Sequence, residues 1–338
     1  MRRTVDSLTG ERILQNRFRS LCPFQHSGWF METSHFVGLI PATHTPFHEE
    51  GRLNLDVIPQ MAEHFLALQV PAVFVCGTTG ESLSLTTAER QAVAREWVNA
   101  TRNTALQVIV HVGHNSQADA CELAKAAQQI GAKAIAAMPP VFFKPASVPE
   151  LVRFMEPVAG AAPDLPFYYY DIPSMTGVSL PAREFLQQAA PVMPNLAGLK
   201  FTNTDMVQLL ECLGHEPGRF DILFGVDECL LAGLALGAEG AVGSSYNFAA
   251  PIYQRLITAW KQGDLTAARA EQLTSIRLIR LLSRYGYMSA ARHVMSLLGM
   301  PIGPARPPHR RLSADELQAF ERELKSTGLW EAIQVRKN

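Results

Sequence analysis

The chain reads PFYYYDIPSMTGVSLPAREFLQQAAPVMPNLAGLKF from Pro166 to Phe201, a stretch that begins and ends with a short apolar run. Runs of this length, rich in aromatic and aliphatic side chains, are typical of strands buried in a parallel sheet. Tyr170 and Lys200 lie near the ends of the two runs and are 30 residues apart, the length of one strand-helix unit. The stretch therefore predicts two adjacent parallel strands that carry these residues at their ends.

Eight runs of this kind occur between Phe36 and Val242. Amphipathic patterns with helical spacing separate them, as at Thr87 to Ala100 and Ser116 to Ile130. Eight strands that alternate with helices favour an α/β fold of the closed (β/α)8 TIM barrel type, which we place at residues 35–248. The runs are Phe36 to Ala42, Ala72 to Cys76, Gln107 to His111, Ala134 to Ala137, Phe167 to Asp171, Leu196 to Phe201, Ile222 to Phe224 and Gly240 to Val242.

An open doubly wound sheet is the alternative. Such a sheet normally has a glycine-rich nucleotide-binding turn after its first strand, whereas this chain has Pro41-Ala-Thr-His-Thr-Pro46. After the eighth run, Ala249 to Gly299 and Ser313 to Gly328 have helical patterns, and Pro301 to Pro308 contains four prolines, which are typical of an extended link. We expect residues 249–338 to form a C-terminal helical extension packed on the barrel.

Residues 1–34 fit neither the barrel pattern nor a separate domain. They begin MRRT, but Asp6 and Glu11 interrupt the basic residues and no apolar core follows, which argues against a signal peptide. An organelle-targeting segment is the remaining alternative. We expect a poorly ordered leader, or a mis-assigned start with translation beginning at Met31.

The charges of the 338-residue chain are balanced, with 30 basic and 31 acidic residues and a formal net charge of −1. Because no field of one sign results, we expect a small-molecule substrate and neither nucleic acid nor membrane as a partner. No apolar run approaches the roughly 20 residues needed to cross a bilayer. The five cysteines are scattered and lack CxxC spacing, which favours reduced thiols in the cytoplasm over disulfides or structural zinc.

Polar residues follow several of the apolar runs, at the end of a barrel where active sites lie. Lys200 stands in the apolar setting Asn195-Leu-Ala-Gly-Leu-Lys-Phe201, where desolvation disfavours the ammonium and leaves free amine to attack a carbonyl. It is a candidate Schiff-base nucleophile, although from residue type alone a lysine that ends a strand and points into solvent is an equal alternative. Strand alternation places Tyr168 and Tyr170 on one face and Tyr169 on the other.

The turn Gly77-Thr-Thr-Gly80 follows the second run and offers backbone N–H groups and two hydroxyls for a carboxylate. A plain strand-to-helix turn with Thr79 or Thr86 as the helix cap is the alternative. His111 and His114 are three positions apart with no third ligand nearby, so we expect no metal site there.

Three motifs resemble those of the pyruvate-dependent class I aldolases, the family of dihydrodipicolinate synthase and N-acetylneuraminate lyase. Gly77-Thr-Thr-Gly-Glu81 resembles the carboxylate-binding motif of that family, Tyr170-Asp-Ile-Pro-Ser-Met-Thr-Gly177 its tyrosine motif, and Gly198-Leu-Lys-Phe-Thr202 its Schiff-base strand. The resemblance covers Phe36 to about Glu331 and keeps the order and spacing of the motifs. It implies that Lys200 is the covalent nucleophile.

The resemblance also implies roles for the other site residues. Thr78 and Thr79 would hold the substrate carboxylate, and Tyr170 would orient it and assist proton transfer, so that Lys200, Tyr170 and Thr79 form the catalytic set. No metal, nucleotide or organic cofactor is implied, and the family suggests a homotetramer, with a dimer as the alternative. The positions that would bind the hydroxylated part of a sugar acid are Thr202, Gly225, Asp227, Glu228 and Ser244.

Within the family, the lyase branch is the more similar. Phe224-Gly-Val-Asp-Glu228 and Met300-Pro-Ile-Gly-Pro304 resemble it, and Met175 stands where synthases typically have an arginine that holds a second carboxylate. Two positions depart from the family pattern. Asp171 replaces a common asparagine, and Phe142-Phe143 replaces an aromatic hydroxyl that reaches a neighbouring subunit's site.

The implied reaction is the reversible cleavage of N-acetylneuraminate, a sialic acid, to N-acetylmannosamine and pyruvate by a carbon–carbon lyase. An aldolase or dehydratase of another 2-keto-3-deoxy sugar acid shares every residue at the pyruvate end. A dihydrodipicolinate synthase is disfavoured by Met175. A catalytically silent barrel that binds a keto acid or a sugar is the alternative outside enzymology.

Overall fold

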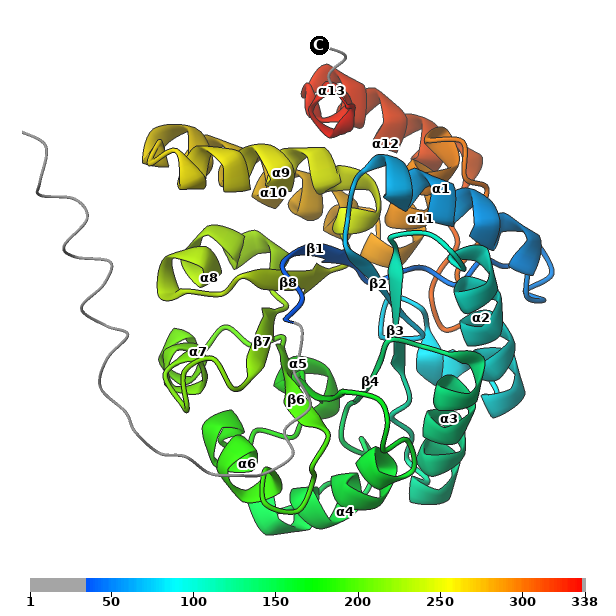
Figure 1. Ribbon diagram of the computed structural model, residues 1–338. Coiled ribbons are helices and arrows are strands. Elements are labelled where there is room, and N and C mark those ends of the chain that lie inside the picture. The colour runs from blue at the N-terminus through cyan, green and yellow to red at the C-terminus, as the bar shows by residue number, and fades with distance from the viewer. Residues whose placement is uncertain (1–34, 336–338) are drawn as a thin grey trace, which may run out of the picture. The chain divides into compact units, whose positions relative to one another are not determined.

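The computed structural model describes residues 35–335, and within them eight parallel strands form one sheet (Figure 1). The strand order is β1-β8-β7-β6-β5-β4-β3-β2, and a parallel bridge between Ala42 and Phe74 joins the first strand to the second, so the sheet curves into a barrel. The expected (β/α)8 barrel is confirmed. The strands are β1 Gly38–Pro41, β2 Ala72–Val75, β3 Gln107–His111, β4 Ala134–Ala137, β5 Phe167–Asp171, β6 Leu196–Phe201, β7 Asp221–Phe224 and β8 Gly240–Gly243.

Helices follow the strands and surround the barrel in Figure 1. Local signals set their ends. Thr86 forms a capping box with Glu89 at the start of α2, and the Ser116 side chain accepts the Asp119 N–H at the start of α3. The helices of this part are α1 Ile58–Ala67, α2 Thr87–Ala100, α3 Gln117–Ile130, α4 Val148–Gly160, α5 Pro173–Thr176, α6 Ala182–Ala189, α7 Met206–Leu213 and α8 Leu230–Leu236, with short 3-10 turns at Leu55–Val57, Ser82–Ser84 and Asp227–Cys229.

The core has two layers that meet at the strands. One fills the barrel interior and includes Phe74, Tyr168 and Tyr170; the other lies between strands and helices and includes Tyr169 and Phe185. The alternation predicted for the three tyrosines is therefore confirmed. Because barrel interiors are packed with side chains, a ligand site is expected at the mouth formed by the strand ends.

An irregularity in β6 decides which way its lysine points. Phe167 of β5 pairs with Leu196, but Tyr168 pairs with Gly198, so Ala197 is an extra residue of the bulge type. The alternation consequently breaks: Ala197 faces the interior, Leu199 faces the helices, and Lys200 is again interior. A Cβ at Gly198 would lie 1.8 Å from the carbonyl oxygen of Asp221, so only glycine fits where the strand bends.

Five helices follow β8, as expected from the C-terminal pattern, and Pro301 to Pro308 contains no helix. In Figure 1 they lie together on one side of the barrel, beside α1. The first of them begins at Tyr246, so the division that we placed between residues 248 and 249 falls inside it. The helices are α9 Tyr246–Lys261, α10 Leu265–Arg284, α11 Tyr287–Leu297, α12 Ala314–Ser326 and α13 Leu329–Ile333.

The predictions for residues 1–34 lie outside the described residues. Within residues 35–335 no helix is long and apolar enough to cross a membrane.

Candidate active site

A cavity of about 510 Å³ opens at the carboxyl ends of the strands. The structure brings together in its wall every residue that the sequence assigned to the site, from five different strand ends. These residues are Thr78 and Thr79 after β2, Tyr170 on β5, Lys200 and Thr202 at β6, Gly225, Asp227 and Glu228 after β7, and Ser244 after β8.

Lys200 is buried, with 3% of its surface exposed, so the alternative of a solvent-pointing lysine is wrong. Its Nζ lies 3.8 Å from the ring centroid of Tyr170 and 4.0 Å from that of Phe74. Burial lowers the pKa of Lys200 from 10.5 to about 7, while the carboxylate of Asp227 opposes this change. Near neutral pH a large share of the side chain is therefore free amine, the form that attacks a carbonyl.

Tyr170 stands directly across from Lys200, because the two residues are register partners on β5 and β6. Its hydroxyl lies 3.2 Å from Oγ1 of Thr78, and either atom can be the donor. Burial raises the pKa of Tyr170 to about 12, so the phenol keeps its proton at neutral pH. The pair thus places a proton donor between the amine and the turn after β2.

The turn Gly77–Glu81 is tightly folded. The Glu81 N–H donates to the carbonyl of Thr78 at 3.0 Å, and Oγ1 of Thr45 donates to the carbonyl of Gly80 at 2.7 Å. Thr79 is buried and lines the cavity beside Thr78. The helix cap in this region is Thr86, not Thr79, which leaves the two hydroxyls of the turn for the cavity.

The acidic pair after β7 has two different environments. Asp227 is buried, and its Oδ2 accepts the backbone N–H and the hydroxyl of Ser245 at 2.9 Å and 2.5 Å. Burial raises its pKa to about 6, while the two bonds from Ser245 oppose this change. Glu228 lines the cavity, and Gly225 is required because a Cβ there would lie 2.0 Å from Oγ1 of Thr202.

The C-terminal helices contribute cavity residues that the sequence pattern did not reveal. Tyr287 at the start of α11 places its hydroxyl 2.6 Å from Oγ of Ser244, and Ile279 and Ser283 of α10 line the same wall. A second cavity of about 400 Å³ shares Thr78, Thr79, Ser244 and Tyr287 with the first. The signal that could have found Tyr287 is its position beside Gly286 at a helix start, but nothing in the pattern indicates which strand end it faces.

Not all of the positions singled out by the family resemblance lie at the site, because Phe142 and Phe143 line neither cavity. Asp171 is buried on β5 and accepts a bond from Nδ2 of Asn203 at 3.3 Å, and burial raises its pKa to about 6. Met175 lines the second cavity. Phe142 and Phe143 are 76% and 85% exposed, with ring centroids 4.9 Å apart.

The two histidines considered as ligands bind backbone groups instead. His111 is buried with Nδ1 2.9 Å from the carbonyl of Cys76, and its Nε2 accepts the Met138 N–H at 3.3 Å. His114 accepts the N–H of Ser116. Among residues 35–335, no group of three or more His, Cys, Asp or Glu side chains is arranged to hold a metal ion.

The chain belongs to the Dihydrodipicolinate synthetase family, whose sequence profile it matches over residues 35–327, and it is therefore a class I aldolase, a carbon–carbon lyase. Its similarity extends to individual relatives. The N-acetylneuraminate lyase of Mus musculus is 41% identical over 304 residues, which cover 89% of this chain and 95% of the relative.

Solved structures agree with these sequence matches. An N-acetylneuraminate lyase of Proteus mirabilis superposes with a TM-score of 0.84 at 42% identity, covering 86% of this chain and 98% of that one. The N-acetylneuraminate lyase (sialic acid aldolase) of Aliivibrio salmonicida also has a TM-score of 0.84, at 40% identity, covering 86% and 97% of the two chains.

Proposed function

We propose that this chain is an N-acetylneuraminate lyase, which cleaves N-acetylneuraminate reversibly to N-acetylmannosamine and pyruvate through a Schiff base on Lys200. The observation that carries the proposal is Lys200 itself, buried at the end of β6 beside Tyr170 with a pKa lowered to about 7. Relatives at about 41% identity that bear this name supply the substrate.

The reaction begins with attack of Nζ of Lys200 on the 2-keto carbon of the open-chain sugar acid. The carbonyl oxygen leaves as water, and a protonated imine remains. Thr78 and Thr79 hold the substrate carboxylate through their hydroxyls and through the N–H groups of the turn after β2. This keeps the keto carbon close to Nζ, on the side of the cavity where Tyr170 lies.

Cleavage then draws the electron pair of the C3–C4 bond toward the imine. The proton of the 4-hydroxyl passes to the substrate carboxylate, either directly or through Tyr170, whose hydroxyl gives its own proton to the carboxylate as it accepts this one. N-acetylmannosamine leaves as the aldehyde, and an enamine of pyruvate remains on Lys200. Protonation of the enamine and addition of water release pyruvate and restore the amine. Side chains and substrate supply every group in this sequence, so we propose that no cofactor takes part.

The opposite wall suits a chain of neutral hydroxyls. Thr202, Ser244 and the carboxylates of Asp227 and Glu228 offer donors and acceptors, and Gly225 leaves room for the sugar. A second substrate carboxylate would meet two acidic side chains there and no guanidinium at Met175. The wall therefore favours a hydroxylated sugar acid over a dicarboxylate.

The test is mass spectrometry of the protein after incubation with N-acetylneuraminate and borohydride, alongside a pyruvate-release assay without reductant. We expect a pyruvate-derived adduct on Lys200 together with turnover, and neither in a Lys200→Met variant. An adduct from pyruvate with N-acetylneuraminate left untouched would move the assignment to another keto-acid aldolase. No adduct from either compound would contradict the catalytic proposal.

We also propose that the protein is a homotetramer in the cytoplasm. The family resemblance supports the tetramer, and the unpaired thiols of Cys76, Cys121, Cys212 and Cys229 suit a reducing compartment. Size-exclusion chromatography with light scattering tests the assembly, and the mass of a dimer or a monomer would contradict it. Fractionation of the native cells tests the compartment.

A further inference from the structure

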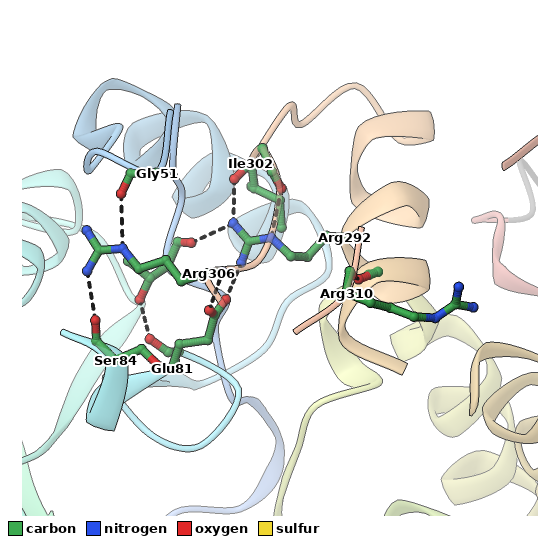
Figure 2. A network of polar contacts seen from close by, with 11 residues as sticks. Gly51, Glu81, Ser84, Arg292, Ile302, Arg306 and Arg310 are labelled. Carbon is green, nitrogen blue, oxygen red and sulfur yellow. Dashed lines mark hydrogen bonds and ion pairs between the residues drawn. The ribbon is translucent and has the colours of Figure 1, made fainter. Parts of the chain in front are cut away.

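The turn that carries Thr78 and Thr79 is bound by residues of the C-terminal segment, which follows the barrel in the chain. It ends in Glu81, a non-glycine residue with a positive φ of 56°. From there the Glu81 side chain reaches the C-terminal segment, where Oε1 accepts Nη1 of Arg292 at 3.0 Å and Oε2 accepts the backbone N–H of Arg306 at 2.8 Å. Figure 2 shows Glu81 between these two arginines. Both oxygens of the carboxylate are thus bound by groups more than 200 positions away in the chain.

Arg292 of α11 is in turn fixed by the backbone. Its Nη2 donates to the carbonyl of Ile302 at 2.6 Å (Figure 2). The same nitrogen donates to the carbonyl of Thr45 at 2.9 Å, and Nε donates to the carbonyl of Gly303 at 2.7 Å. All three nitrogens of the guanidinium are therefore engaged, and the side chain cannot rotate without breaking several bonds.

The same network reaches the turn by a second route. The carbonyl of Thr45 accepts a hydrogen bond from Nη2 of Arg292. The hydroxyl of the same threonine donates a hydrogen bond to the carbonyl of Gly80 at 2.7 Å. The turn has no free space at this point, because a Cβ on Gly80 would lie 3.2 Å from backbone atoms of Cys76 and of Thr43. The loop after β1 and helix α11 therefore hold the turn from two sides.

Stability alone is a weak reason for this arrangement. The side chains of Arg292 and Glu81 are 2% and 1% exposed, and an ion pair so deeply buried loses about as much hydration energy as it gains. Burial raises the pKa of Glu81 and the charge of Arg292 only opposes that change, which agrees with a high desolvation cost. What the pair does in this chain is join the turn to the C-terminal segment in one geometry, through both oxygens of Glu81.

We propose that Glu81 and Arg292 are positioning residues for the carboxylate end of the substrate: their ion pair holds the turn so that Thr78 and Thr79 present their hydroxyls and N–H groups to that carboxylate. The proposal rests on the proposed function, in which the turn binds the carboxylate of pyruvate. Neither residue lines the wall of the cavity around Lys200, although Glu81 lines the second cavity beside it.

The test is Glu81→Gln, which keeps the size of the side chain. A glutamine has one oxygen, so its amide nitrogen faces either Nη1 of Arg292 or the N–H of Arg306, both of which are donors. With pyruvate and borohydride, we expect the pyruvate concentration for half-maximal trapping on Lys200 to rise about tenfold or more, since displacement of about 1 Å can cost up to a hundredfold. The limiting trapping rate at saturating pyruvate stays within about twofold, because the surroundings of Lys200 do not change.

Glu271→Gln is the matched control. Glu271 accepts two bonds from Arg255, at 2.8 Å and 2.9 Å, between α10 and α9 and without contact to the turn. We expect this variant to trap pyruvate as the native chain does. An unchanged half-maximal concentration in Glu81→Gln, or an equal change in the control, overturns the proposal, and so does a limiting rate that falls by the same factor.

The double variant Glu81→Gln with Arg292→Met covers the case in which the single variant folds poorly. It leaves no unpaired charge buried, but the carbonyls of Thr45, Ile302 and Gly303 lose the donor that Arg292 supplies, so its melting temperature is measured beside that of Glu81→Gln. Its half-maximal pyruvate concentration should nevertheless stay raised, which a purely structural role would not produce. If the native chain traps no pyruvate, the proposed function fails. If the native chain traps pyruvate and the variants have the same half-maximal concentration as it does, only the positioning role fails.

Discussion

The burial of Lys200 makes the stability of the chain depend on pH in a defined window. In the native state the pKa of this side chain is lowered from 10.5 to about 7, mainly by desolvation. Each tenfold step in a protonation equilibrium corresponds to 1.36 kcal/mol, so protonated Lys200 destabilises the native state by roughly 5 kcal/mol relative to the unfolded chain. Lys200→Met, which keeps the length of the side chain and removes the charge, should recover much of this free energy at low pH.

The direction follows from proton counting. Below about pH 7 both states carry the proton and the native state bears the whole penalty. Between about 7 and 10.5 the unfolded chain binds more protons at this position than the native chain does, so the stability of the native protein rises with pH. The advantage of Lys200→Met should therefore be largest near pH 6 and should shrink through this window.

The assay is urea unfolding of both proteins at several pH values from 6 to 10, at one fixed protein concentration because assembly affects apparent stability. Lys133→Met, at an exposed lysine, is the control and should differ from the native protein by a constant amount. A difference between Lys200→Met and the native protein that stays constant across this range would refute the reasoning, since it would mean that Lys200 titrates as an exposed lysine does.

Three further substitutions test the site. Tyr170→Phe should lower the rate of N-acetylneuraminate cleavage by roughly a hundredfold or more, as expected for loss of a proton-transfer group, while pyruvate trapping persists; cleavage at the native rate would contradict the role. Tyr287→Phe removes the 2.6 Å bond to Ser244 and should raise KM for the sugar acid by about tenfold with pyruvate trapping unchanged, and a KM equal to the native value would show that this bond does not orient the sugar end. Gly225→Ala places a Cβ 2.0 Å from Oγ1 of Thr202 and should lower the free energy of unfolding by about 1–3 kcal/mol, which calorimetry checks; native stability would show that the loop yields freely.

The barrel could be predicted from sequence because its strands are short apolar runs with polar residues after them. Six of the eight runs begin at the residue where the strand begins; the exceptions are β1, which starts at Gly38 and not Phe36, and β7, which starts at Asp221. The residue at which a strand begins depends on which backbone N–H and C=O groups of the neighbouring strand are close enough to form hydrogen bonds. The pattern of apolar residues does not show where those groups lie.

The candidate site was predictable where its residues lie at the end of a strand, as Lys200 does, or directly after one, as Thr202 and Gly225 do. Tyr287 was not, because a helical pattern shows that a helix has an apolar face without showing which strand end it covers. The ion pair of Glu81 and Arg292 was missed for the same reason. The two residues are 211 positions apart, and neither position has a local pattern that marks a buried charge.

The bulge in β6 lets this strand carry one residue more than regular pairing needs without turning the amine away. Leu196 and Leu199 both face the helices although they are three positions apart, and Lys200 therefore faces the interior. Deletion of one residue between them would leave a regular strand in which the same two leucines face the helices and Lys200 still faces the interior. A chain descended from this one could thus lose a codon here and keep its amine in the barrel, whereas straightening the strand at its present length would turn that amine away from the substrate.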